Sequence, residues 1–189
     1  MKILVISDKE SEMLTKFYHQ NNLDEVDFIL SVGDLPHAYL ESVKTNLNKP
    51  LLYINGNHDL YKTKLFDKNF IEWKCAEICG VKIVGIGCKK REEKMLTEAE
   101  MSEKLNKLYK KLKNKKIDIV ISHYPAAGIG DGDDATHKGY QSIKEFVEKI
   151  KPTYFVYGHN HLNYNRTSRM IEMDNIKYLN AYEKFILDF

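Results

Sequence analysis

YFVYGHNHLNYN, residues 154–165, places two histidines one residue apart directly after an apolar, aromatic run that is typical of a β-strand. On an extended chain, side chains at positions i and i+2 point to the same side, so His159 and His161 are expected to share a face. Two imidazoles that point toward one place indicate a metal site. The alternative is a polar turn in which both histidines are solvated. The residues that follow the other predicted strands decide between these two interpretations.

The other apolar runs alternate with helical patterns over most of the chain. Strands are predicted at 2–7, 26–33, 50–56, 117–122 and 153–158, with an antiparallel hairpin over 70–87 and short strands near 168–173, 176–181 and 184–188. Helices are predicted at 10–20, 37–47, 97–115 and 142–150. Alternating strands and helices favour a largely parallel, buried sheet, and the final strands add an antiparallel portion. The pattern therefore predicts the α/β class.

Size and composition narrow the classes of protein that the chain can represent. A chain of 189 residues fits one domain, residues 1–189, with a sizeable core. The formal net charge of +2 is too small to indicate a nucleic-acid partner, and no stretch could span a bilayer, so a cytoplasmic protein is expected. Three cysteines are an odd number, which fits reduced thiols better than a disulfide framework. Nothing in the sequence indicates an oligomeric state.

Polar residues follow five of the predicted strands. They are Asp8, Asp34, Asn57-His58-Asp59, His123 and His159-Asn160-His161. In open α/β sheets, ligands bind in the crevice beyond the carboxyl ends of the strands. Each of these residues alone suits a turn. Five such strand ends together indicate that His159 and His161 belong to a larger cage of ligands.

The cage offers oxygen and imidazole nitrogen but no sulfur, a ligand set that suits Mn, Fe, Zn or Mg. It holds too many ligands for one structural ion. Two ions about 3.5–4 Å apart that share a bridging carboxylate are typical of in-line displacement at phosphorus. His58 stands beside a predicted ligand, Asn57, and is free to donate a proton to the leaving alkoxide, while Asp59 is predicted to orient it.

These motifs resemble, in order, those of the calcineurin-like metallophosphoesterases. The family pattern of D-x-H, G-D, G-N-H-[D/E], a lone His and G-H-x-H corresponds here to SDKE (7–10), VGDLP (32–36), NGNHD (55–59), SHYP (122–125) and GHNH (158–161). The resemblance implies a metallo-dependent phosphatase-like fold, an α/β/β/α sandwich with mixed sheets and the site at the strand termini. It also implies two divalent ions. The first would be held by Asp8, Asp34 and His161, and the second by Asp34, Asn57, His123 and His159, with His58 as general acid.

One position departs from the family pattern. Where D-x-H requires a histidine, this chain has Glu10. A glutamate oxygen could replace the imidazole, adding negative charge and favouring a harder ion such as Mn or Mg, and Mn is the favoured metal. Alternatively, Glu10 only flanks the N-terminus of the first predicted helix, where a carboxylate is favourable in any case.

The function predicted from the sequence is hydrolysis of a small phosphate monoester or diester by attack of a metal-bound hydroxide. The loop at 126–140 is predicted to be a mobile surface loop, and the alternative is that its aspartates or His137 cover the metals and touch substrate. A second hypothesis is a non-catalytic scaffold that keeps the fold and uses one face for protein contacts, although such a module does not need an intact Asn57-His58-Asp59. A nuclease is disfavoured by the balanced charge.

Overall fold

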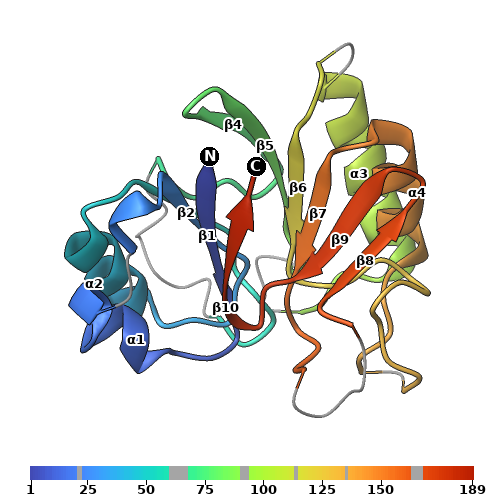
Figure 1. The fold of residues 1–189 in the computed structure, drawn as a ribbon. Helices are drawn as coiled ribbons and strands as arrows, with labels where there is room; N and C mark the ends of the chain where they lie inside the picture. Colours follow the sequence, from blue (N-terminus) through green and yellow to red (C-terminus); the bar gives the residue numbers. More distant parts are fainter. Residues whose placement is uncertain (21–22, 60–67, 90–93, 113–114, 135, 163–167) are drawn as a thin grey trace.

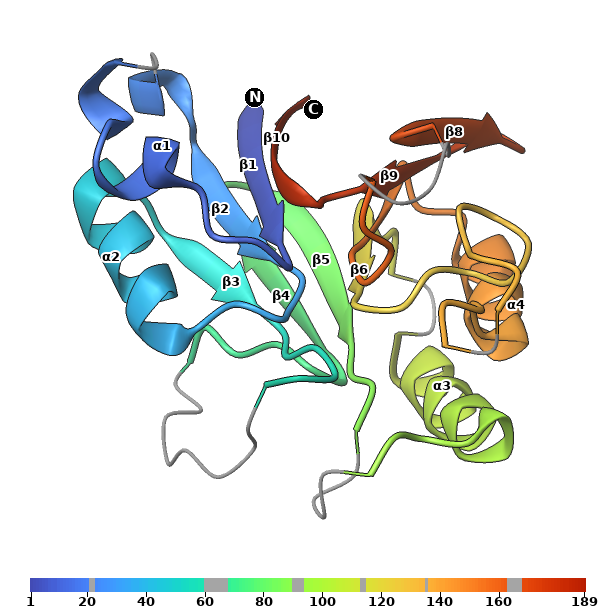
Figure 2. The same ribbon diagram turned by 90° about the horizontal axis from the view of Figure 1, so that it is seen from below.

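The computed structural model describes residues 1–20, 23–59, 68–89, 94–112, 115–134, 136–162 and 168–189. These residues form two β-sheets with helices on their outer faces (Figures 1 and 2). The first sheet has the strand order β10-β1-β2-β3. Its strands are β1 (Lys2–Ser7), β2 (Phe28–Ser31), β3 (Leu51–Tyr53) and β10 (Glu183–Asp188). β1, β2 and β3 are parallel, and β10 pairs antiparallel with β1 at the edge.

The second sheet has the strand order β4-β5-β6-β7-β9-β8. Its strands are β4 (Lys74–Ile78), β5 (Val81–Ile86), β6 (Ile119–Ser122), β7 (Tyr154–Tyr157), β8 (Met170–Met173) and β9 (Ile176–Asn180). The four central strands are parallel, and an antiparallel strand closes each edge. Both sheets are therefore mixed, with the parallel strands in the buried interior.

The helices lie outside the two sheets, so that the layers run helix, sheet, sheet, helix (Figure 2). They are α1 (Glu12–Thr15), α2 (His37–Leu47), α3 (Glu98–Leu112) and α4 (Gln141–Ile150), with 3₁₀ turns at Tyr18–Gln20 and Leu23–Glu25. Alternate residues of a strand belong to different layers of the core. Val5 belongs to the buried cluster that includes Ile83 of the second sheet, while Leu4 belongs to the cluster that includes Val43 of α2. The predicted α/β/β/α sandwich is confirmed. Within the described residues, no helix is both long and apolar enough to cross a membrane.

The helix predicted at 10–20 is the main difference from the sequence-based assignment. Only Glu12–Thr15 is α-helical, and Ser11, the residue directly before it, makes no side-chain capping bond. Its hydroxyl instead donates to Glu183 Oε1 at 3.2 Å. Leu14 is the one buried residue of α1, whereas Met13 and Phe17 are exposed. Because a short helix depends on tertiary packing rather than on propensity, a single buried residue is too little to extend this one.

The predicted hairpin at 70–87 is confirmed as the antiparallel pair β4–β5, and its turn allows a stability prediction. Cys79 and Gly80 connect the paired residues Ile78 and Val81 with φ of 50° and 80°. Two central residues at positive φ correspond to a type I′ turn, for which Asn-Gly is the preferred sequence. We expect Cys79→Asn to raise the free energy of unfolding by about 0.5–1 kcal/mol. Urea unfolding measures the change. Cys79→Val, with a β-branched side chain at the same exposed position, is expected to lower stability, and the opposite order of the two variants would contradict the assignment.

Candidate metal centre

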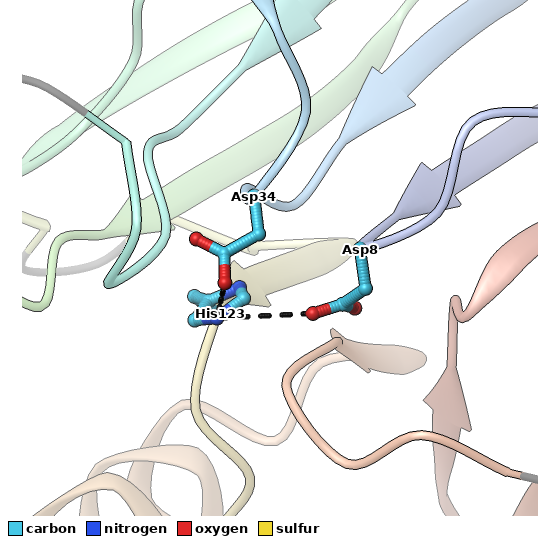
Figure 3. A group of neighbouring side chains, drawn as sticks. All are labelled: Asp8, Asp34 and His123. Carbon is cyan, nitrogen blue, oxygen red and sulfur yellow. Dashed lines mark ion pairs between the residues drawn. The ribbon is translucent and has the colours of Figure 1, made fainter.

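Two carboxylates and one imidazole converge at the carboxyl ends of strands from both sheets (Figure 3). Asp8 follows β1, Asp34 follows β2, and His123 follows β6. His123 Nε2 lies 3.3 Å from Asp34 Oδ2 and 4.0 Å from Asp8 Oδ1, and the three side chains are 0%, 10% and 1% exposed, respectively. Each residue offers one ligand atom, and these atoms all lie within 4.8 Å of one another. The strand ends thus bring these three side chains into a compact, buried group, and their role as metal ligands stays a prediction.

The backbone is strained where it delivers these side chains. Asp8, Asp34 and His159 all have left-handed backbone angles, with φ of 64°, 56° and 65°. Such conformations cost non-glycine residues of the order of 1–3 kcal/mol each, and they cluster at functional sites. A neighbouring glycine makes room for one of them, because a Cβ added at Gly56 would lie 2.2 Å from Asp34 Oδ1. Contacts with the surrounding fold must therefore stabilise the left-handed backbone conformation at these three residues.

Hydrogen bonds to backbone carbonyls define which ring nitrogen of each histidine faces the centre. His123 Nδ1 lies 2.9 Å from the carbonyl oxygen of Val32, so this nitrogen carries the proton and Nε2 is directed inward. In His159 the roles are reversed, because Nε2 lies 2.9 Å from the carbonyl oxygen of Thr136 and Nδ1 is directed inward. Both inward nitrogens approach Asn57 Oδ1, at 2.8 Å and 3.0 Å. Two nitrogens and an amide oxygen thus converge beside the carboxylates.

This convergence creates a need for positive charge. Burial lowers the pKa of His159 to about 4, so its ring is neutral, and its Nδ1 presents a lone pair to an oxygen that can only accept. Burial also disfavours the charged form of His123, but the hydrogen bond to Asp34 and the charge of Asp8 outweigh it and raise its pKa to about 9. In the metal-free chain, the proton on His123 therefore supplies positive charge at this place. A divalent cation would satisfy the same lone pairs, so the residues present fit a metal.

His161 lies on the Asp8 side of the centre. Its Nε2 is 3.8 Å from Asp8 Oδ1, its side chain is 39% exposed, and its ring packs against Tyr182 with the ring centroids 4.7 Å apart. The ring of His159 thus approaches Asn57 and the ring of His161 approaches Asp8. The expected shared face assumed an extended chain, whereas His159 has a φ of 65°. This arrangement is compatible with two ions that share Asp34, although the division of ligands between them stays a prediction.

Glu10 stands apart from the ligands that the structure brings together. The cluster found among the described residues contains Asp8, Asp34 and His123 but not Glu10, which is exposed. The residues on either side of Glu10 make contacts outside the cluster. Lys9 pairs with Glu183 at 2.9 Å, and the backbone N–H of Ser11 donates to the Tyr39 hydroxyl at 2.9 Å. Ligation by Glu10 stays a prediction, and in this geometry the first metal would depend on its other three ligands.

His58 and Asp59 lie beside the centre in different environments. The backbone N–H of His58 donates to Asp34 Oδ1 at 2.8 Å, while its side chain is exposed. The Asp59 carboxylate accepts from the backbone N–H groups of Asp34, at 2.7 Å, and Gly56, at 2.8 Å. Burial raises the pKa of this carboxyl. Asp59 therefore ties the Asp34 and Gly56 turns together, and its predicted role in orienting the His58 ring stays a prediction.

The loop at 126–140 contacts the centre through its backbone, a connection that the sequence does not reveal. Besides the Thr136 carbonyl that bonds His159, the amide of Asn160 donates to the carbonyls of Gly130, at 2.9 Å, and His137, at 3.2 Å. The His137 ring lies 5.5 Å from the His159 ring, centroid to centroid. The described part of this loop is thus joined by hydrogen bonds to His159 and Asn160, while its mobility stays a prediction.

Comparisons with known proteins agree with the fold. Residues 1–181 match the family model described as calcineurin-like phosphoesterase superfamily domain. Among solved structures, TT1561 of Thermus thermophilus has a TM-score of 0.68 at 13% identity, over 96% of this chain and 89% of that one. GAP50, titled the anchor in the inner membrane complex of Plasmodium, has a TM-score of 0.56 at 13% identity, over 95% and 70%. A search of curated proteins found no match.

Proposed function

Because the chain belongs to the calcineurin-like phosphoesterase superfamily, we propose that it is a divalent-metal-dependent phosphoesterase acting on a small phosphate monoester or diester. One observation carries the proposal: inward-facing nitrogens of His123 and His159 meet the acceptor oxygen of Asn57 beside two carboxylates. A domain that serves only as a scaffold has no need to gather carboxylate, imidazole and amide groups in one largely buried place. A cytoplasmic location and the absence of nucleic-acid and membrane partners stay predictions from the sequence.

The residues that would hold the metals are those of the centre. We assign Asp8, Asp34 and His161 to one ion and Asp34, Asn57, His123 and His159 to the other, with Mn favoured because carboxylate and amide oxygens suit harder cations. Bound divalent ions supply Lewis acidity that polarises the phosphoryl group and lowers the pKa of the attacking water. The protein contributes the positions of the ligands, through Asp59 on the Asp34 turn and through the carbonyls of Val32 and Thr136 on the two histidines.

His58 is assigned as the general acid. Its backbone bond to Asp34 places it next to the centre, while its exposed side chain is not engaged as a ligand there. In this role His58 donates a proton to the oxygen of the leaving alcohol as the bond between phosphorus and that oxygen breaks. The phosphorus gains the oxygen of the attacking water, so that the products are a phosphate and an alcohol.

A scaffold function is the second candidate. Two observations favour it: Glu10 lies outside the cluster, and a protein titled as an anchor shares the fold. The two functions differ in a simple assay. Metal-depleted protein is given Mn, Mg, Zn or Fe and tested on chromogenic phosphate monoesters and diesters, with the bound metal counted by elemental analysis. We expect hydrolysis that depends on added metal and prefers one ester type, whereas metal binding with no hydrolysis of either ester would support the scaffold.

Metal affinity is expected to strengthen with rising pH. His123, with its pKa of about 9, is protonated at neutral pH in the metal-free chain, and an ion that binds Nε2 must displace this proton. Affinity therefore rises as the proton becomes easier to remove, by up to about tenfold per pH unit for each proton released, and levels off above about pH 9. Titration calorimetry in two buffers of different ionisation enthalpy measures the released proton. Equal affinities at about pH 6 and about pH 8 would contradict this account.

A further inference from the structure

A cavity of about 390 Å³ adjoins the metal centre on the side of His58. Asp34, His58 and Asp59 line one part of its wall, so the cavity begins at the residues assigned to metal binding and proton transfer. It extends from there toward the N-terminus of α2 and the end of β3. Its volume is within the range of small-molecule sites. Neither the ligand assignments nor the proposed proton transfer makes use of this space.

The part of the cavity away from the centre is mainly apolar. Its described lining there includes Leu35, Pro36, Leu40 and Tyr53. His37, which is half-buried, stands edge-on to the Tyr53 ring with the ring centroids 5.7 Å apart, so the two rings form one aromatic corner. No lysine or arginine is found among the described residues of the lining. Among these described residues, a second phosphate or a carboxylate would find no lysine or arginine to pair with.

We propose that this cavity binds the leaving group of the substrate and selects an uncharged, largely apolar, ring-sized alcohol. The inference rests on the proposed phosphoesterase function and extends it to a substrate class. The geometry supplies the direction: when the phosphoryl group lies at the metal centre, the leaving oxygen must be within reach of His58, and His58 lines this cavity. The alcohol attached to that oxygen then lies against the apolar wall, where His37 is a specificity-determining residue.

The test compares esters whose leaving alcohols have similar acidity but different size and charge. Benzyl phosphate, ethyl phosphate and 4-carboxybenzyl phosphate are assayed as monoesters and as methyl diesters, by release of the named alcohol. We expect kcat/KM to be at least about tenfold higher for benzyl than for ethyl, because burial of an aromatic ring is worth about that much. The carboxylate of the third ester should remove this advantage. Equal values for benzyl and ethyl esters would overturn the proposal.

Two matched variants test whether the preference for benzyl esters arises in this cavity. His37→Trp fills the aromatic corner and is expected to lower kcat/KM for the benzyl ester more than for the ethyl ester, so that the benzyl preference is lost. His19→Trp makes the same substitution at a histidine outside the cavity and should change neither. An equal loss on both esters in His37→Trp, with its melting temperature and metal content retained, would show that the cavity does not select the alcohol.

A binding measurement separates failure of this inference from failure of the proposed function. Benzylphosphonate and ethylphosphonate cannot transfer their phosphoryl group and are added to protein with methyl-labelled leucine. We expect the methyl signals of Leu35 and Leu40 to shift with benzylphosphonate only, and His37→Trp to remove the shift. These shifts without hydrolysis of any ester would refute the phosphoesterase but keep the ligand pocket. Hydrolysis without these shifts would support the phosphoesterase function and refute binding of the alcohol in this cavity.

Discussion

Replacing Asp34 with asparagine is expected to abolish metal-dependent hydrolysis and to leave the fold intact. The introduced side chain keeps an oxygen that can accept the His58 N–H, as Asp34 Oδ1 does at 2.8 Å. Its amide group would face His123 Nε2, now 3.3 Å from Oδ2. Loss of the Asp34 charge removes one cause of the raised His123 pKa, and in the neutral ring Nε2 can accept from this amide. The variant loses the charge that attracts a cation. An interaction between unit charges in such a site is about 4 kcal/mol, which corresponds to about a thousandfold in affinity.

The measurements follow binding, stability and activity separately. In the parent protein, added Mn should raise the melting temperature, since an ion that binds the native state stabilises it in proportion to the logarithm of its concentration over Kd. In Asp34→Asn we expect this metal-dependent increase to disappear, the metal-free melting temperature to change little, and kcat/KM to fall at least about a thousandfold. Asp24→Asn, at an exposed position away from the centre, is the control. Full metal binding by Asp34→Asn would remove Asp34 from the ligand set.

The strand ends explain why so much of the centre could be predicted from the sequence. A buried strand is recognised from local composition, and its next residue is carried to a predictable edge of the sheet whatever the distant chain does. Asp8, Asp34 and His123 illustrate this, because each needs only its own strand to reach the cluster. The division of the chain into domains, by contrast, stays a prediction from its length.

The supporting contacts could not be predicted because they carry no side-chain signal. The carbonyls of Val32 and Thr136 determine which nitrogen of each histidine faces inward, and any residue type has such a carbonyl. The same holds for Asp59, whose carboxylate accepts from backbone N–H groups rather than from side chains. The prediction of a helix at 10–20 was wrong for a different reason, since Leu14 is the one buried residue of α1, while Met13 and Phe17 stay exposed. Sequence periodicity predicts an amphipathic face but not whether a partner lies opposite it.

Replacing His58 with glutamine is expected to lower kcat by about 10²–10⁴-fold and to leave metal content and KM nearly unchanged. The geometry explains why kcat is expected to fall while metal content and KM stay nearly unchanged. The contact of His58 with the centre is its backbone N–H on Asp34, which glutamine retains, while the side chain is exposed. Loss of the ring therefore removes a proton donor and leaves the ligands in place. Metal analysis and steady-state kinetics on one preparation measure both effects, and His19→Gln, at a histidine outside the centre, provides the control.

Esters with different leaving groups distinguish two roles for His58, that of a proton donor and that of a residue that only shapes the site. An ester of an acidic phenol departs without protonation, so His58→Gln should reduce its hydrolysis far less than that of an alkyl ester. A change in site geometry would instead slow both esters to a similar degree, because both require the same alignment of water and phosphoryl group. An equal loss on the two esters, or a parallel loss of bound metal, would assign His58 to positioning rather than to proton transfer. A loss confined to the alkyl ester would identify the imidazole as the group that protonates the departing oxygen.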